Sequence, residues 1–417
     1  MKLSKPGLVI AVLVGLIAGV LLIALLRGCT APKEPPQPPA ETAAAPTEAP
    51  AETDSPPPAE TPQGSALAVE GLTFARLSDT EIYLQWQDDL DARAEGYVIY
   101  RRSASGRDDW AEVGRVASGE GHSFTDTLGR AAPQQFLYRV DVLLPQGSAD
   151  TAAAGSPVLA SNRSVCIDPG HYLGSSELER TELYGYGEGL FMLRLGLALR
   201  DTLRAEYGVD AVLTRETDEI TIGGYSNGEL DNQHLSLRGE FARGQDLFVS
   251  LHTNANQDDA NGYPTCNQPA EITKTLLFVN LPGAASEETL LQANEIGTRV
   301  SAVNAALGIA PSDRFDRVRP GRLHDWSDDF NDALNTPGTV CQRLGEKQQD
   351  YYGVLRGAAA VGVPGLIIEH AFHTVAAMRR AAMQGDLAAQ WAEADAAGIA
   401  AGYGFLTAET IRTQTGV

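Results

Sequence analysis

The chain has 417 residues, of which 43% are hydrophobic and 21% charged, and its formal net charge is −22. This composition predicts a globular protein of two or three domains. The acidic balance argues against a nucleic-acid-binding protein, because an acidic surface repels phosphate. Four cysteines exclude a small scaffold built on disulfides.

The N-terminus carries a long apolar segment. Residues 7–26 contain no charged side chain, and at 1.5 Å per residue they are long enough to cross a bilayer core of about 30 Å. We therefore expect residues 1–30 to form a single-pass membrane anchor. A lipoprotein signal ending at Cys29, or a cleaved signal, is the alternative, although Arg27 fits a lipoprotein site poorly. Lysine and arginine flank the segment on both sides and do not decide its orientation.

A proline-rich segment follows the apolar one. Residues 31–65 hold 11 of the 23 prolines, with repeated Ala, Glu and Thr and no aromatic residue. Such a composition buries too little apolar surface to offset the entropy of ordering. We expect a disordered linker that separates the later domains from the membrane.

Short alternating strands occupy residues 67–158. The segments 81–87 and 136–144 alternate along the strand, 96–102 carries apolar residues on both faces, and no helical pattern lies between them. This pattern predicts a β-sandwich of about ninety residues. Trp86 on the second strand, YVIYRR on the third and FLYRV near the end resemble a fibronectin type III domain. We expect a spacer or a weak binding module without catalytic residues.

From residue 163 the pattern changes to alternating strands and helices. Apolar strands are expected at SVCIDPGH, which runs into a Pro-Gly turn, and at VDAVLTR, LFVSLH, TLLFVN and GLIIEHAF. Long helices are expected at 187–208, ending at Gly208, and at about 286–306 and 346–360. LFVSLH has no polar alternation before Ser250 and should be a central strand buried on both faces. The predicted fold class is α/β, with a mixed sheet flanked by helices.

Polar side chains end three of these strands. His171 follows CIDPG, His252 closes LFVSLH, and Glu369 lies in GLIIEHAF, while Glu188 begins the first long helix. Sites in open α/β sheets gather at the carboxyl ends of strands. Two imidazoles and one carboxylate are a common ligand set for catalytic zinc, which leaves one position open. A further carboxylate nearby can take a proton from water. Each residue alone is weak evidence, because strand-end histidines and helix-start glutamates are usually structural.

Several motifs occur together and in order. CIDPGH, a glutamate at a helix start, LTRETD, LSLRGEFA, DLFVSLHTNA and VPGLIIEHAF span about residues 163–405. This region resembles the zinc-dependent N-acetylmuramoyl-L-alanine amidases of the amidase family 3 type. The resemblance implies an extracytoplasmic enzyme that cuts the amide between N-acetylmuramic acid and L-alanine in peptidoglycan. It implies Zn²⁺ bound by His171, Glu188 and His252, with Glu369 as the catalytic carboxylate, and a C-terminal tail at 406–417.

Two other functions stay open from the sequence. A zinc peptidase that cuts within the stem peptide would use the same ligands, and a non-catalytic wall-binding protein would have the same fold. The expected partners are peptidoglycan and, through the anchor, the cell membrane; whether a protein activator exists cannot be read from the sequence.

Other residues rank lower as site candidates. His370 is expected on the strand face opposite Glu369. His373 is expected to be structural unless the strand has ended, and His324 to lie in a polar insertion spanning residues 311–352. Arg238 is expected to form an ion pair.

Three of the cysteines lie in the α/β region. Cys166 is expected in the core. Cys266 and Cys341 are expected in polar loops, where a disulfide between them is conceivable.

Overall fold

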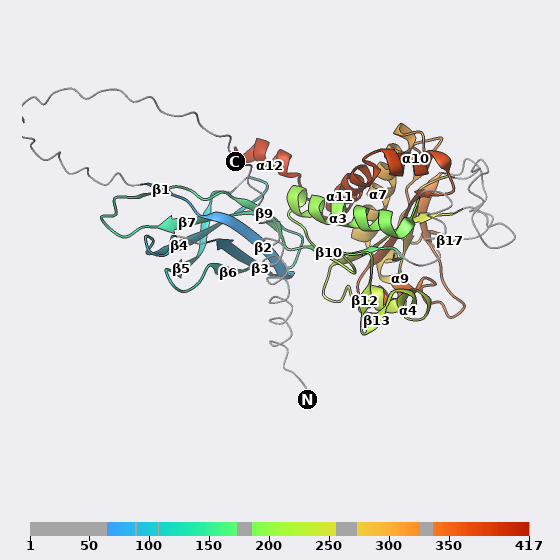
Figure 1. The fold of residues 1–417 in the computed structure, drawn as a ribbon, viewed down its shortest axis with the longest axis horizontal. Coiled ribbons are helices and arrows are strands. Elements are labelled where there is room, and N and C mark those ends of the chain that lie inside the picture. The colour runs from blue at the N-terminus through green and yellow to red at the C-terminus, as the bar shows by residue number, and fades with distance from the viewer. Residues whose placement is uncertain are drawn as a thin grey trace, which may run out of the picture. The chain divides into compact units, whose positions relative to one another are not determined.

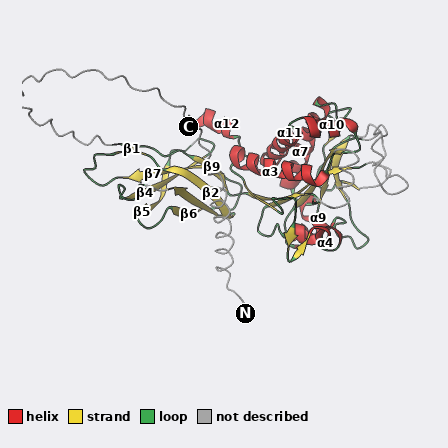
Figure 2. Ribbon diagram, viewed as in Figure 1, coloured by secondary structure: helices red, strands yellow, loops and turns green. Residues whose placement is uncertain are grey.

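The computed structural model describes residues 65–87, 90–106, 108–172, 186–255, 273–325 and 337–416. The expected anchor and linker, residues 1–64, lie outside these ranges. Among the described residues, no helix is long and apolar enough to cross a membrane. The described part contains a β-sandwich and an α/β domain (Figure 1, Figure 2).

The sandwich consists of two antiparallel sheets. One has the order β2 (Glu70–Ser78), β3 (Glu81–Gln87), β6 (Ser123–Thr127). The other has the order β5 (Ala111–Ala117), β4 (Gly96–Ser103), β7 (Gln135–Leu143), β9 (Val158–Ser161). The alternation in β3 buries Ile82, Leu84 and Trp86 between the sheets, as predicted. Two short strands, β1 (Ala66–Leu67) and β8 (Thr151–Ala152), pair with each other.

The α/β domain is built on an eight-stranded sheet. Its parallel part has the order β11 (Asp210–Leu213), β10 (Ser164–Pro169), β14 (Leu247–Asn254), β19 (Gly365–Phe372). The strand β15 (Leu276–Val279) then runs antiparallel to β19. The strands β18 (Gly338–Gln342), β16 (Phe315–Asp316) and β17 (His324–Asp325) complete the sheet. The mixed sheet confirms the predicted fold class, and β14 is central and buried as expected.

Helices cover both faces of this sheet. On one face α3 (Glu188–Tyr207), α7 (Glu287–Ala306) and α11 (Leu387–Tyr403) contribute residues such as Leu195, Ile296 and Trp391 to the larger core. On the other, α9 (Gly353–Ala360) adds Leu355 and Ala358 to a second core. It packs against α5 (Ser236–Glu240). Shorter elements are β12 (Thr221–Ile222), β13 (Tyr225–Ser226), α4 (Asn227–Asn232), α6 (Leu281–Ala284), α10 (Ala376–Gln384) and α12 (Ala408–Thr415).

The segment 311–352, expected as a polar insertion, supplies β16, β17 and β18 to the main sheet. Two expectations in this part of the chain were wrong. The helix expected at 346–360 begins only at Gly353. Cys341 lies in β18 rather than in a loop, and its buried thiol is free. Burial raises the pKa of this thiol to about 12. Cys266 lies outside the described residues.

The segment expected to be a tail forms helix α12, which contacts the sandwich. Ile411 of α12 is buried in a small cluster with Ala104 and Leu137 of the sandwich. The side-chain nitrogen Nε2 of Gln135 donates to the main-chain carbonyl oxygens of Tyr207 and Leu406. The C-terminus thus contributes to the packing of the first domain.

Polar contacts also join the sandwich to the α/β domain. The guanidinium of Arg76 in β2 pairs with Asp246 at 3.1 Å and is almost fully buried. The guanidinium of Arg204 in α3 lies over the ring of Phe74, 4.8 Å from its centre. The two domains thus share one largely buried ion pair, at Arg76, and one cation–π contact, at the more exposed Arg204.

Candidate metal centre and its surroundings

The predicted site residues lie at one edge of the sheet, where β10, β14 and β19 end. His171 follows β10 with a backbone φ of 57°, a left-handed conformation that is uncommon for histidine. At the preceding Gly170, a Cβ would lie 2.5 Å from Cε1 of His252. Glycine is therefore required here, because the β10 backbone passes directly beside the His252 ring.

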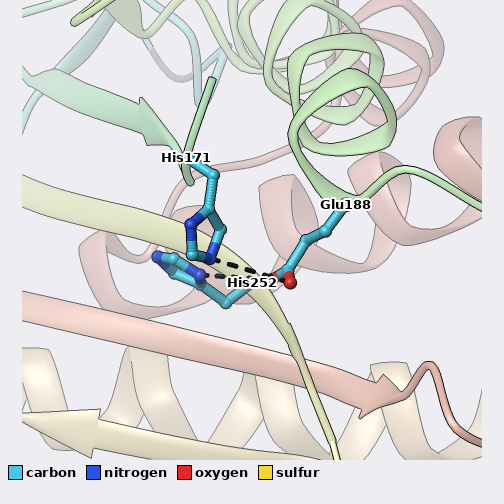
Figure 3. Close-up of side chains that lie close together, drawn as sticks. All are labelled: His171, Glu188 and His252. Atoms are coloured by element: carbon cyan, nitrogen blue, oxygen red, sulfur yellow. Dashed lines mark hydrogen bonds and ion pairs between the residues drawn. The ribbon is translucent and has the colours of Figure 1, made fainter. Parts of the chain in front are cut away.

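The side chains of His171, Glu188 and His252 point toward one another (Figure 3). Oε1 of Glu188 lies 3.3 Å from Nδ1 of His252, and Oε2 lies 3.7 Å from Nε2 of His171. The two imidazole rings meet edge to face, with centroids 4.9 Å apart. The structure thus brings together the three residues that the sequence predicted as metal ligands.

Electrostatics favour the protonation states that bind a metal. Glu188 is buried at the N-terminus of α3. Burial opposes its ionisation, but the charge of His171 and the hydrogen bond with His252 hold the pKa of this carboxyl well below its usual range. Burial lowers the pKa of His252, although Glu188 partly offsets this effect. A carboxylate and a neutral imidazole are the forms that coordinate cations.

A buried ion-pair network supports His171 from behind. Nδ1 of His171 lies 3.7 Å from Asp231 in α4, and Asp231 pairs with Arg238 at 2.7 Å. Arg238 is buried and also pairs with Asp168 at 2.9 Å, so it forms ion pairs as predicted. Burial alone would raise the pKa of Asp231, but His171 and Arg238 hold it below its usual range. A carboxylate behind a ligand histidine fixes the orientation and tautomer of the ring.

Glu369 lies in β19 directly opposite His252 in β14. Its Oε2 is buried and has no hydrogen-bond partner among the described residues. Burial, followed by repulsion from Glu188, raises the pKa of this carboxyl to about 8. A buried carboxyl oxygen without a partner is costly unless a cation, water or substrate completes its surroundings.

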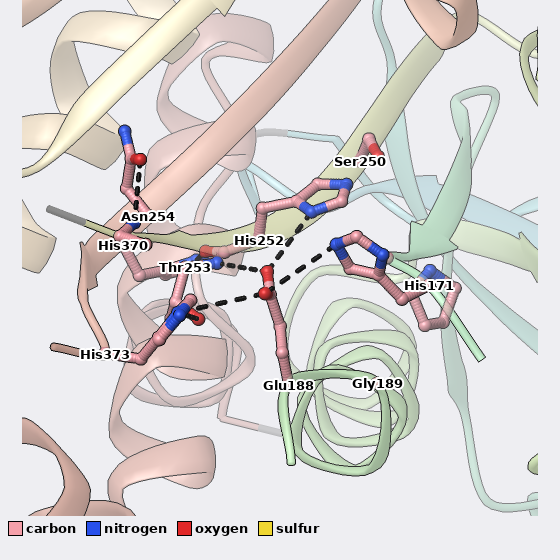
Figure 4. Close-up of polar contacts among 12 residues, drawn as sticks. His171, Glu188, Gly189, Ser250, His252, Thr253, Asn254, His370 and His373 are labelled. Atoms are coloured by element: carbon pink, nitrogen blue, oxygen red, sulfur yellow. Dashed lines mark hydrogen bonds and ion pairs between the residues drawn. The ribbon is translucent and has the colours of Figure 1, made fainter. Parts of the chain in front are cut away.

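His373 lies closer to the site than the sequence indicated. Strand β19 ends at Phe372, so His373 turns toward Glu188, with Nδ1 3.8 Å from Oε2 (Figure 4). The same nitrogen lies 3.1 Å from Oγ1 of Thr253, and the ring stacks on Tyr186 at 5.7 Å. His373 therefore belongs to the wall that fixes the carboxylate of Glu188.

The other histidines lie elsewhere. His370 points to the opposite face of β19 from Glu369, as predicted, and is fully buried against Trp391 of α11. His324 is exposed in β17. Asp231 was not predicted, because nothing in the polar segment around it signals its approach to His171.

The three donor groups fit a zinc ion. Zinc–nitrogen and zinc–oxygen bonds of about 2.0–2.2 Å in a tetrahedron place neighbouring ligand atoms about 3.3–3.6 Å apart. In the Glu188 carboxylate, Oε1 lies 3.3 Å from His252 and Oε2 lies 3.7 Å from His171, so each histidine approaches a different oxygen. Two imidazoles and one carboxylate also match a catalytic zinc site with one position open.

A comparison with known protein families finds one match. The family model described as N-acetylmuramoyl-L-alanine amidase matches residues 165–401. No curated protein sequence matches the chain significantly.

Solved structures also match the chain, among them the following three. The N-acetylmuramoyl-L-alanine amidase from Clostridium difficile 630 is 18% identical, with 57% of this chain and 95% of that chain covered and a TM-score of 0.35. Ami1 from Mycobacterium smegmatis is 17% identical, with 58% and 97% covered and a TM-score of 0.36. Cwp6 from Clostridium difficile is 18% identical with a TM-score of 0.36, and the match covers 57% of this chain but 28% of Cwp6.

Proposed function

This chain belongs to the N-acetylmuramoyl-L-alanine amidase family, and we propose that it hydrolyses the amide between N-acetylmuramic acid and L-alanine with zinc and a glutamate base. The observation that carries the proposal is the convergence of His171, Glu188 and His252 within the matched region. His171 Nε2, His252 Nδ1 and the Glu188 carboxylate would hold the ion. When bound, zinc would polarise the scissile carbonyl group and lower the pKa of a water molecule to about 7.

Glu369 is proposed as the general base. Its position opposite His252 and its unpartnered buried oxygen support this role. The carboxylate would take the proton of the attacking water and then give it to the nitrogen of L-alanine. Protonation is required because an amine anion is a very poor leaving group. A pKa raised above that of ordinary glutamate makes this carboxyl a better proton acceptor and donor near neutral pH.

The surrounding residues would keep the ligands in place. Asp231 would accept a hydrogen bond from Nδ1 of His171, which leaves Nε2 of that ring as the ligand atom. The amide nitrogen of Thr253 donates to Oε1 of Glu188 at 2.8 Å, and His373 borders the other oxygen. These contacts orient the carboxylate without occupying the open side of the site.

We further propose that the enzyme acts outside the cytoplasm, where peptidoglycan lies. Residues 7–26 would anchor the chain in the cell membrane and residues 31–65 would act as a linker. The sandwich is proposed to be fibronectin type III-like, which its three-stranded and four-stranded sheets and buried Trp86 support. Protease accessibility of the C-terminal domain in intact and permeabilised cells would test the orientation.

The deciding experiment is mass analysis of products after the full chain digests purified peptidoglycan. An amidase releases stem peptides that begin with a free L-alanine amine and leaves intact glycan chains. A zinc peptidase would release fragments cut within the stem peptide, and a wall-binding protein would release nothing. A chelator should abolish release and added Zn²⁺ should restore it; release that is insensitive to the chelator would contradict the zinc mechanism.

A further inference from the structure

We propose that His370 is a positioning residue that holds the metal ligand His252 through its main-chain carbonyl, and that Asp395 fixes the His370 ring for this task. The inference rests on the proposed metal-binding function of His252. It concerns the layer of side chains beneath the sheet, on the opposite face from Glu369.

The contacts of His370 are specific at both ring nitrogens. Nδ1 lies 3.1 Å from the carbonyl oxygen of His252, and Nε2 lies 2.9 Å from Oδ2 of Asp395. A carbonyl oxygen can only accept a hydrogen bond, so Nδ1 must carry a hydrogen. Both His370 and Asp395 are completely buried, where such hydrogen bonds are strong and their loss is costly.

The contact lies where the regular strand pairing is interrupted. His252 pairs with Glu369, but two residues later Asn254 pairs with Phe372, so the register of β14 and β19 shifts between them. Such bulges change the direction of a strand and of its side chains. His370 is located within the shift and reaches across it to the carbonyl of His252. It therefore bonds the main chain of the ligand residue at the point where that main chain departs from the regular ladder.

The ring of His370 is itself held by two helices. It stacks on Trp391 of α11 at 4.7 Å with an interplanar angle of 25°. The indole nitrogen of Trp391 donates to Asn304 of α7 at 2.9 Å, and Asn304 donates to the carbonyl of His370 at 2.7 Å. The ring has hydrogen bonds along two directions and a stacked neighbour, which leaves it one orientation. A rigid outer support of this kind typically accounts for about 10–100-fold in metal affinity.

Substitutions can separate the two hydrogen bonds. In His370→Asn the amide nitrogen can take the place of Nδ1 and still donate to His252. In His370→Gln the longer side chain reaches toward Asp395 instead. His370→Leu keeps much of the volume and removes both bonds. Val300→Ala is the control for lost stability, because Val300 is buried in the core on α7 and is not a proposed ligand.

The test measures Zn²⁺ affinity by competition with a chromophoric chelator, using the full chain and no substrate, together with the metal-free melting temperature. We expect His370→Leu and His370→Gln to weaken zinc binding at least about tenfold. The zinc affinity of His370→Asn should stay within about threefold of that of the unchanged chain. Val300→Ala should have a lower melting temperature and unchanged zinc affinity. The inference would be overturned if folded His370→Leu and His370→Asn bound zinc with equal affinity. It would also be overturned if the loss of zinc affinity across all four variants simply followed the loss of melting temperature.

The experiment distinguishes failure of the positioning role from failure of the proposed function. If the unchanged chain binds zinc but cuts no peptidoglycan amide, the proposed activity fails and the positioning role is unaffected. If the chain cuts the amide and all His370 variants bind zinc equally, only the positioning role fails. If the unchanged chain binds no zinc, the metal assignment and this inference both fail.

Discussion

Oε1 of Glu188 lies 3.3 Å from Nδ1 of His252 and also accepts the amide hydrogen of the next residue, Thr253, at 2.8 Å. One strand end therefore provides both a neighbouring ligand atom and the hydrogen bond that directs the carboxylate toward it. The carboxylate is oriented by the main chain and needs little rearrangement when a cation binds.

Removing a ligand histidine should remove the metal. His171→Ala or His252→Ala leaves two donor groups, which hold zinc poorly at neutral pH. We expect the bound zinc, measured by atomic emission after gel filtration, to fall from about one ion per chain to almost none. His122→Ala is the matched control, because His122 lies in the sandwich beside Asp91. A full complement of zinc in the double histidine variant would contradict the ligand assignment.

Asp231 should contribute to metal affinity without touching the ion. Asp231→Asn keeps an acceptor for Arg238 but removes the charge beside His171. We expect zinc affinity to fall by about 10–100-fold, as is typical when the carboxylate behind a ligand histidine is lost. Chelator competition measures the change. Asp218→Asn, an exposed carboxylate in the same loop region, serves as the control.

Glu369→Gln should separate catalysis from metal binding. Glutamine has the shape of glutamate but cannot accept the proton, so turnover on muropeptides should fall at least about a hundredfold. Zinc content should stay near that of the unchanged chain, because Glu369 is not a proposed ligand. A variant with full zinc that retains more than a tenth of the turnover would exclude Glu369 as the base. His373, which borders Glu188, would then be the next residue to test.

The same substitution should change how stability depends on pH. The pKa of Glu369 is raised from 4.5 to about 8 in the metal-free fold. Between these values the unfolded chain releases a proton that the folded chain retains. The free energy of unfolding therefore falls as pH rises, by at most about 1.4 kcal/mol per pH unit from this group. Below pH 4.5 the group is neutral in both states and has no such effect.

Urea unfolding of the metal-free chain at pH 5.5 and 7.5 would measure this linkage. The free energy of unfolding of the unchanged chain should fall between pH 5.5 and pH 7.5 by about 2 kcal/mol more than that of Glu369→Gln. The reason is that glutamine cannot titrate. A difference between the two proteins that does not vary with pH would show that Glu369 has an ordinary pKa in the metal-free fold.

Helix α12 should stabilise the sandwich. Ile411 is buried against Ala104 and Leu137, so Ile411→Ala should lower the free energy of unfolding by about 2–4 kcal/mol. Hydrogen exchange should show faster opening of β4 and β7, which lie beneath the helix. Thr413→Ala on the exposed side of α12 is the control and should leave exchange unchanged. Unaltered protection of β4 and β7 in the Ile411 variant would mean that the sandwich is independent of the C-terminus.

The sequence predicted the ligand cluster because each member ends or begins a strongly patterned element. His252 lies near the end of a mostly apolar strand, and Glu188 begins a helix whose apolar face is periodic. Such local patterns determine where an element stops, and parallel strands bring their ends to one edge. The direction of β15 could not be predicted in this way, because its apolar run is the same in either direction.

Residues that depend on long-range packing were missed or misplaced. Asp231 reaches His171 only because the β12–β13 hairpin and α4 fold back over the end of β10. Cys341 lies in a five-residue strand within a polar stretch, where neither periodicity nor length distinguishes it from a loop. The sequence does not predict the direction of the His373 side chain, because this direction depends on whether the strand ends before or after His373.

The burial of Ile411 against the sandwich also has a consequence during synthesis. Ala104 and Leu137 leave the ribosome long before α12 has been translated. Until then the sandwich exposes an apolar patch that α12 later covers. A chain without α12 would keep this patch uncovered, and a protease or chaperone that binds exposed apolar surface would distinguish it from a chain that carries the helix.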